Sequence, residues 1–257
     1  MKNAVKSMLK VDSRRMFRSR LFYIILATAL ILPILMTVMM AMMDGAETVN
    51  RQTGEVTIME GPENAWQNIG SFAGIEMGGS EIFAMCNVNM MFMGVAVFIC
   101  LFISEDFRSG YAKNLFTVRA KKGNYVLSKT IVGFVTGALM LILYFLGAIL
   151  GGAIAGLSFD LHGLNIGNLV SCLFSKIFLM LVFVAIDVLV SVSAKSKAWL
   201  CLCGSLAICM MLFMMVSMIS PLSATLLNVV LCLAGGAIFA FGLGAISRVV
   251  LKKTSLV

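Results

Sequence analysis

Charged residues are scarce in this chain, and their scarcity excludes the water-soluble classes of protein. Only 12% of the 257 residues are Asp, Glu, Lys or Arg, whereas 60% are hydrophobic and the mean hydropathy is +1.00. Soluble domains carry roughly 25% charged residues. Too little polar surface is left to cover a soluble fold, so the sequence indicates a protein that lies in a membrane.

Nucleotide, metal and catalytic motifs are lacking as well. The sequence contains no G-x-x-x-x-G-K-[ST] phosphate loop, no H-E-x-x-H motif and a single histidine, His162. Its seven cysteines lie in or beside apolar stretches without a C-x-x-C spacing, which is typical of small packing residues. We therefore expect no metal site, no cofactor and no enzyme activity in this chain, and an intramembrane enzyme is disfavoured.

Six apolar stretches are long enough to cross a bilayer, which takes about 20 helical residues. They cover about 21–43, 85–104, 129–157, 169–194, 198–219 and 224–247. The predicted fold class is therefore an all-α polytopic membrane protein, with a cytosolic helix over 1–20 and a six-helix transmembrane domain over 21–257. Pro33 is expected to kink the first span and to free a carbonyl.

Lys and Arg cluster at alternate ends of these spans. They lie mainly in 2–20 and 108–129, with smaller groups at 195–197 and 248–253. Basic residues are retained on the cytoplasmic side of a bilayer, so both termini are predicted to be cytoplasmic. The expected location is a plasma membrane, of the bacterial inner-membrane type. Membrane lipid then accounts for the net charge of +8, and nucleic acid is not expected as a partner.

The outer loop over 44–84 is acidic instead. Turn residues 52–55 between two short apolar runs predict a small hairpin with strands at 49–51 and 56–58. Trp66 and the stretch 72–83 are expected at the outer membrane interface. The loop is either a solvated spacer or an external gate or docking site, and charge pattern favours the spacer.

The amino-terminal segment predicts an amphipathic helix. A basic residue recurs every four positions, at Lys2, Lys6, Lys10, Arg14 and Arg18. Apolar residues such as Met8 and Met16 fall away from this basic stripe. The pattern favours a helix in the headgroup plane, attracted by anionic lipid. The alternative is a basic tail that only fixes topology.

The first cytosolic loop, 105–128, has the most specific local pattern. The acids Glu105 and Asp106 end the second span, and Arg108 and Lys113 lie within helical reach of them, so we expect ion pairs there. The aromatic residues that follow are then exposed, as in a surface that contacts another protein. The alternative is an interfacial aromatic belt beside positive charge.

This region resembles the signature region of type-2 permeases of ATP-binding-cassette (ABC) exporters. The matching residues, in order, are Glu105, Gly110, Arg119, Tyr125 and Lys129. Val118 stands where that family often has a Pro. The resemblance extends over the whole chain: a basic first helix, six spans, cytosolic ends and a short second cytosolic loop.

The resemblance implies a function in transport and two protein partners. In that family the first cytosolic loop seats a coupling helix in a cleft of a separate ATPase subunit, which binds ATP and Mg, and two permease copies work together. The expected ATPase-contact residues are Glu105, Asp106, Phe107, Arg108, Gly110, Tyr111, Phe116 and Arg119.

Two charges lie within the fourth span. Lys176 and Asp187 are eleven residues apart, so they lie on one helix face, roughly 16 Å apart along the axis, too far to pair directly. Charged groups within spans generally face a bundle interior or an aqueous path. The equally weighted alternative is that each side chain extends to a different membrane interface.

The predicted function is the permease subunit of an ABC exporter. Its spans are poor in charge and rich in Met, which fits a hydrophobic or amphipathic substrate, with a peptide toxin or antimicrobial peptide favoured by the resemblance. The alternative is an ion-coupled secondary carrier or drug-efflux protein without an ATPase partner. Such a carrier would need paired mid-membrane charges and an internal repeat, and no repeat is visible.

Overall fold

The computed structural model is a bundle of long helices. It describes residues 2–49, 56–58, 61–70, 87–117 and 122–253. The elements are α1 (Lys2–Arg18), α2 (Arg20–Met42), β1 (Glu47–Val49), β2 (Val56–Ile58), the 3-10 turn η1 (Ala65–Asn68), α4 (Met90–Arg108), α5 (Tyr111–Thr117), α6 (Lys122–Ala155), α7 (Ile166–Ala194), α8 (Ala198–Ile219) and α9 (Leu226–Lys253).

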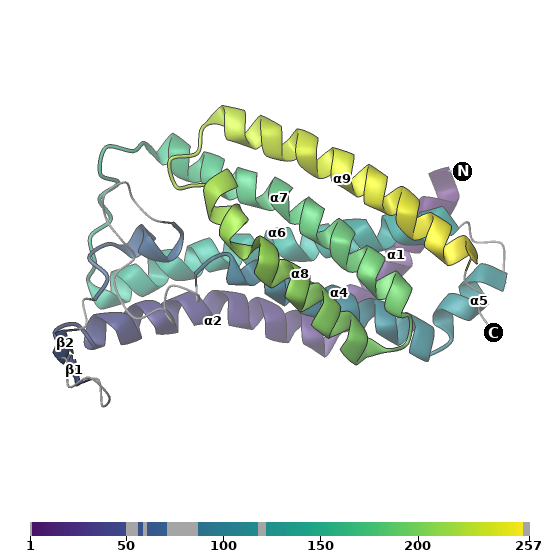
Figure 1. Cartoon of the computed structure of the whole chain (residues 1–257), viewed down its shortest axis with the longest axis horizontal. Coiled ribbons are helices and arrows are strands. Elements are labelled where there is room, and N and C mark those ends of the chain that lie inside the picture. The colour runs from purple at the N-terminus through teal and green to yellow at the C-terminus, as the bar shows by residue number, and fades with distance from the viewer. Residues whose placement is uncertain (1, 50–55, 59–60, 71–86, 118–121, 254–257) are drawn as a thin grey trace.

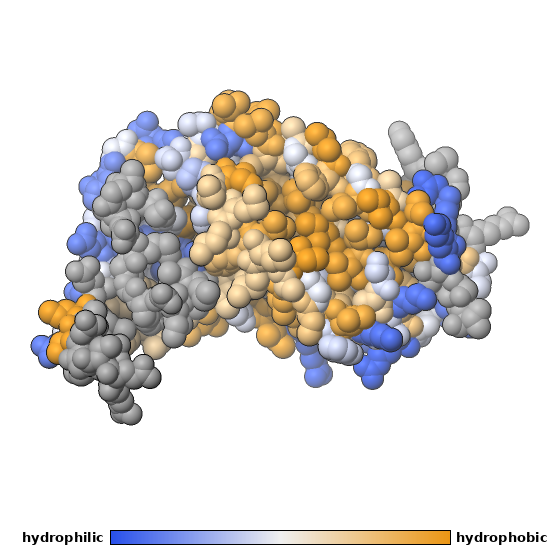
Figure 2. Space-filling model, viewed as in Figure 1, coloured by the Kyte–Doolittle hydropathy of each residue, from blue (hydrophilic) through white to orange (hydrophobic). Residues whose placement is uncertain are grey.

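Six helices of the described chain, α2, α4 and α6 to α9, are long and apolar enough to span a membrane, as predicted. Figure 1 shows the start of α1 and the end of α9 at one end of the bundle, beside α5, whereas the β1–β2 hairpin and η1 lie at the other. Hydrophobic surface covers the middle of the bundle, with hydrophilic surface toward both ends (Figure 2). The predicted cytoplasmic position of the termini stays a prediction. We call the end with α1 and α5 the basic end.

The helix bounds match the predicted spans except around the first loop. Helices coincide with the first, fourth, fifth and sixth predicted spans to within a few residues, apart from a longer end to α9. However, α4 runs from Met90 to Arg108 and α6 begins at Lys122, so most of the described part of the predicted loop 105–128 is helical. The spans were predicted from apolar residues alone, which overlooks helical turns that continue beyond the hydrocarbon region.

The close contact between α2 and α6 explains why two positions of α6 are occupied by glycine. A Cβ on Gly147 would lie 2.4 Å from the Leu30 carbonyl oxygen, and one on Gly151 would lie 3.0 Å from the Ile34 Cα. The small residues therefore let the two backbones approach closely, as the small-xxx-small spacing indicates. Helix α2 continues through Pro33, whose carbonyl accepts a 2.7 Å hydrogen bond from the Thr37 hydroxyl.

The 3-10 turn η1 forms part of the end of the bundle opposite the basic end. The hairpin is present, with β2 where predicted and β1 at 47–49, two residues before the predicted strand. Trp66 is buried within the protein: its ring packs on Phe159 and its Nε1 donates to the Phe159 carbonyl at 3.2 Å. Its predicted position at the outer membrane interface stays a prediction. Residues 64–69 of this loop are therefore packed in the protein, whereas its described residues 44–47, 56 and 58 are exposed, and the role of the loop stays a prediction. The stretch 72–83 lies outside the described residues.

Helix α1 packs on the bundle through one narrow face. Met8, Asp12 and Met16, spaced one turn apart, are buried, and α1 makes its main contacts with α6. The described cations of the basic stripe, Lys6, Lys10, Arg14 and Arg18, are all exposed on the opposite side. Much of the apolar face predicted to meet lipid therefore meets α6. An interfacial position for the exposed part of α1 stays a prediction.

Candidate functional site

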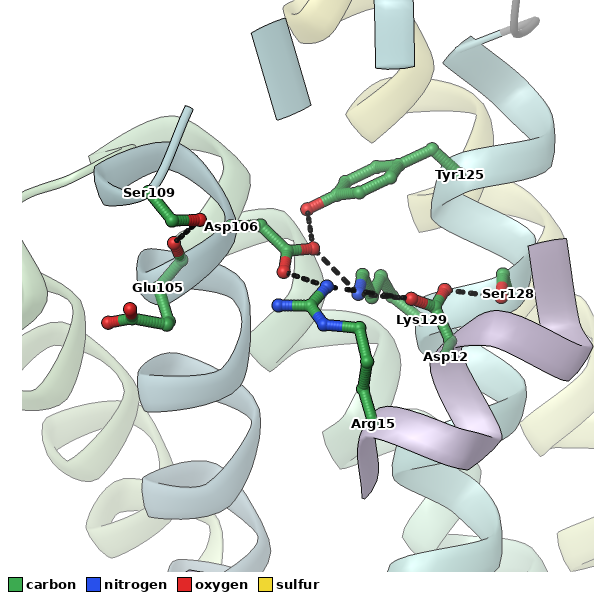
Figure 3. Close-up of polar contacts among 8 residues, drawn as sticks. All are labelled: Asp12, Arg15, Glu105, Asp106, Ser109, Tyr125, Ser128 and Lys129. Carbon is green, nitrogen blue, oxygen red and sulfur yellow. Dashed lines mark hydrogen bonds and ion pairs between the residues drawn. The ribbon is translucent and has the colours of Figure 1, made fainter. Parts of the chain in front are cut away.

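Four charged side chains meet at the basic end of the bundle, from three different helices. We call Asp12 and Arg15 of α1, Asp106 of α4 and Lys129 of α6 the charge cluster (Figure 3). The two carboxylates are fully buried and Lys129 is 2% exposed. Charges taken out of water are costly unless they are paired and hydrogen-bonded. The cluster can therefore exist only because each helix supplies a partner for the next.

Lys129 is the centre of the charge cluster. Its ammonium nitrogen lies 2.8 Å from Asp12 Oδ1 and 2.6 Å from Asp106 Oδ2, and thus bridges two acids from different helices. The same nitrogen lies 4.1 Å from the centre of the Phe102 ring. A single lysine thereby joins α1 and α4 to α6.

Arg15 closes the other side of the cluster. Its guanidinium donates to Asp106 Oδ1 at 2.5 Å and lies 4.4 Å from the centre of the Tyr111 ring in α5. Burial alone would lower the pKa of Arg15, but the carboxylates of Asp106 and Asp12 outweigh it and raise that pKa. Burial, together with the same two acids, raises the pKa of the Tyr111 hydroxyl. Arg15 therefore stays charged, and Tyr111 stays neutral, at physiological pH.

Two neutral hydroxyl groups complete the site. Tyr125 donates to Asp106 Oδ2 at 2.9 Å, and Ser128 donates to Asp12 Oδ2 at 2.6 Å. Both come from the first turns of α6, ahead of Lys129, so one short segment supplies three donors. With two cations, two anions and these hydroxyls, the charges of the cluster balance. Such an arrangement favours a rigid joint over a catalytic centre, since every charged group already has its partner.

The predicted ion pairs of the first loop are wrong. Asp106 pairs with Arg15 and Lys129 rather than with Arg108 or Lys113, both of which are exposed. Residues that are two positions apart in an α-helix point in directions roughly 200° apart around its axis. Arg108 therefore points to the surface when Asp106 points into the bundle.

Glu105 behaves differently from its neighbour. Its side chain is exposed and points away from the charge cluster in Figure 3, while its backbone carbonyl accepts a 2.7 Å hydrogen bond from the Ser109 hydroxyl. Gly110 follows with a φ of +74°, a left-handed conformation that favours glycine and lets α5 turn away from α4. Arg119 lies outside the described residues.

The loop aromatics are less exposed than predicted. Phe107 and Phe116 are half-buried and pack edge-on against the Tyr125 ring, at centroid distances of 6.4 Å and 5.3 Å. Tyr111 is half-buried against Arg15. Phe116 and Tyr111 therefore attach α5 to the charge cluster, and the described exposed surface of the loop consists mainly of polar residues.

The two charges of α7 face the protein interior, not opposite membrane interfaces. Lys176 is 1% exposed, and its ammonium donates to the Ser220 carbonyl at 3.0 Å and to Asn89 Oδ1 at 3.3 Å. Asp187 is fully buried, and neither carboxylate oxygen has a hydrogen-bond partner among the described residues. That Lys176 and Asp187 line a transport path stays a prediction.

Asp12 is the member of the charge cluster that was not predicted from the sequence. It is the only acid in the first 43 residues, and it lies four residues after Met8 and four before Met16 on the apolar face of a basic helix. An acid at that position is the available signal for a buried ion pair. The sequence could not say which cation it meets, because Lys129 lies 117 residues away.

The comparison with known protein families gives a match over most of the chain. A family model described as ABC-2 family transporter protein matches residues 13–203. No curated protein and no solved structure matches the chain. The matched region includes Arg15, Asp106 and Lys129 of the charge cluster and most of the bundle. With its six potential spans, the chain belongs to the ABC-2 transporter family and is a membrane permease component of an ABC transporter.

Proposed function

We propose that the chain is an exporter permease driven by a separate ABC ATPase subunit, which contacts the end of α4 and helix α5. Family membership implies an ABC ATPase partner. The observation that carries the choice of contact surface is the charge cluster directly behind it. Exposed Glu105 and Arg108 flank buried Asp106 on the last turn of α4. One turn of helix therefore carries both an outward polar surface and an inward ionic joint.

The joint gives a route for motion from α5 to the spans. Force on α5 reaches Arg15 through Tyr111, and reaches Tyr125 through Phe116. Arg15 and Tyr125 both bind Asp106, whose other ion pair is with Lys129 of α6. A push by the ATPase on α5 would then move α1, α4 and α6 together, because ion pairs buried among packed aromatic rings resist separation.

The substrate we propose is hydrophobic or amphipathic, with an antimicrobial or toxin peptide favoured. An apolar cavity of about 480 Å³ lies where α7, α8 and α9 meet, and Met215, Met218 and Phe239 are among its lining residues. Adaptable thioether side chains suit apolar ligands of varied shape. We further propose that two copies, or this chain with a similar one, act together in a bacterial plasma membrane with ATP and Mg bound by the ATPase.

A purification experiment tests the ATPase partner. The tagged chain is extracted in mild detergent and the co-eluting proteins are identified. We expect an ABC ATPase in the sample. Its absence under gentle conditions would contradict the proposal.

The contact surface is tested by changing Glu105→Ala in the co-purified complex. Loss of an exposed side chain leaves the charge cluster intact, so the protein is expected to insert normally while ATP hydrolysis falls at least about tenfold, the loss expected for about 1.4 kcal/mol of coupling. Glu47→Ala, an exposed acid at the opposite end, is the matched control. Equal hydrolysis in wild type and Glu105→Ala would show that the ATPase binds elsewhere.

A further inference from the structure

A second apolar groove lies between α6 and α9 at the basic end. Its volume is about 550 Å³, and its walls include Val126 and Phe134 of α6 and Ala240 and Gly244 of α9, with Leu181 of α7 also lining it. It lies on spans that the proposed ATPase contact does not use. Its described lining is mostly apolar, and Arg248 is the one charged residue in it.

The packing of α9 explains why the groove is open there. At Gly236 the helix is pressed against α7, since a Cβ there would lie 2.6 Å from the Phe178 carbonyl oxygen. Two turns later a Cβ on Gly244 would meet only Val126 Cγ1, at 4.0 Å. Helix α9 therefore lies close to α7 at one point and leaves space beside α6 farther along.

The groove has one charged end. Arg248 and Asn124 both line it there, and the aliphatic stem of Arg248 lies over Gly123, with Cδ 3.3 Å from the position that a Cβ would take. Nearby Lys122 is already engaged, because it donates to the Leu251 carbonyl at 2.6 Å. Within the described part of the chain, the exposed Arg248 guanidinium has no carboxylate partner.

The rest of the described groove lining does not require a hydrogen bond from a ligand. The Thr130 hydroxyl, on its α6 wall, donates to the Val126 carbonyl of its own helix at 3.0 Å. An occupant thus needs a long apolar part and an anionic end with hydrogen-bond acceptors. A phospholipid with a negative headgroup has both, and guanidinium groups bind phosphate oxygens in a forked geometry.

We propose that this groove binds one anionic phospholipid, with an acyl chain between α6 and α9 and its phosphate on Arg248 and Asn124. A basic pocket between membrane helices is a known setting for such headgroups. Because α6 also carries Lys129, the lipid would hold the base of α6 against the last turns of α9, which lie at the same end of the bundle as α1 and α5 (Figure 1).

The test is lipid binding to the purified full chain, measured by native mass spectrometry with dioleoyl phosphatidylglycerol against dioleoyl phosphatidylcholine. The acyl chains are identical, so the comparison isolates the headgroup. We expect the wild type to prefer phosphatidylglycerol, and Arg248→Gln to reduce that preference about fivefold, as expected for one basic residue near a membrane surface. Arg20→Gln, which removes an exposed arginine at the start of α2, is the control and is expected to keep the preference.

A second pair of variants tests the groove itself. Gly244→Leu places a side chain in open space within the groove and is expected to reduce binding of both lipids, whereas Gly242→Leu, also in open space but not among the lining residues, is not. An equal loss in Arg248→Gln and Arg20→Gln would mean diffuse attraction and would overturn the site. Unchanged binding in Gly244→Leu would equally overturn it, as expected if a second copy of the chain covers the groove. Neither result bears on the ATPase contact, which is measured by ATP hydrolysis.

Discussion

The charge cluster and Asp187 are two answers to the same problem, a carboxylate removed from water. Asp106 and Asp187 are both fully buried. Asp106 is bound by Arg15, Tyr125 and Lys129 from two other helices. Asp187 lacks a hydrogen-bond partner among the described residues. The two carboxylates are therefore equally buried, but among the described residues only that of Asp106 has hydrogen-bond and ion-pair partners.

The difference follows from where each acid lies. Asp106 is on the last turn of α4, where the first turns of α6 and the side of α1 converge and bring long cationic side chains. Asp187 is two turns from the end of α7, near Cys100 and Ser205, and the Ser191 hydroxyl donates to the Asp187 backbone carbonyl at 2.6 Å instead of to the carboxylate. Long cations reach a buried acid most readily at helix ends, because there they can enter from the headgroup side.

The largest effect on stability is expected from removing Lys129, the central cation of the charge cluster. Lys129→Met leaves Asp12 and Asp106 buried without their shared partner, and loss of one member of a buried ion pair costs about 3–5 kcal/mol. We expect a large fall in the midpoint of thermal unfolding of the purified chain in detergent. Lys113→Met, at an exposed lysine of α5, is the control and should unfold as the wild type does. An unchanged midpoint in Lys129→Met would mean that the cluster does not stabilise the fold.

The second prediction compares the two acids directly through Asp106→Asn and Asp187→Asn. The first removes a charge that holds two cations and should destabilise by about 2–3 kcal/mol, since hydrogen bonds to charged groups contribute about that much. The second removes a carboxylate whose burial is uncompensated, so stability should stay the same or rise. The measurement is again thermal unfolding of both variants side by side. A fall of the same size in both would show that Asp187 has a partner that the described residues do not reveal.

The smallest effect is expected at the contact between α5 and the cluster. Tyr111→Leu keeps an apolar side chain but removes the ring over Arg15, and a partly buried cation–π contact contributes about 0.5–2 kcal/mol. Faster hydrogen exchange in α5, with little change elsewhere, is the expected result. The distant ring pair is the control: Phe174→Leu, beside Phe178 on α7, should leave exchange in α5 unchanged. Faster exchange throughout α1, α4 and α6 would instead make Tyr111 part of the cluster's core.

The sequence predicted the fold better than the site. Six spans, the first helix and the hairpin follow from local patterns of apolar, basic and turn residues, and these patterns survive in the structure with shifted ends. The pairing of Asp106 was predicted wrongly because only neighbours in sequence were considered, and its true partners lie 91 residues before it in α1 and 23 after it in α6. For Lys176 the sequence left an interior position and a membrane-interface position equally weighted, because its partners Asn89 and Ser220 carry no signal in sequence.

The sequence by itself determined that this is a six-span membrane protein with a basic helix at its start, because the bilayer imposes length and hydropathy on each segment separately. Only the tertiary structure decided that α1 packs on α6 through Met8, Asp12 and Met16, and that Lys129 joins Asp12 to Asp106. The physical reason is that a buried charge depends on which helices meet around it. That arrangement is a property of the packed bundle, whereas hydropathy is a property of each segment alone.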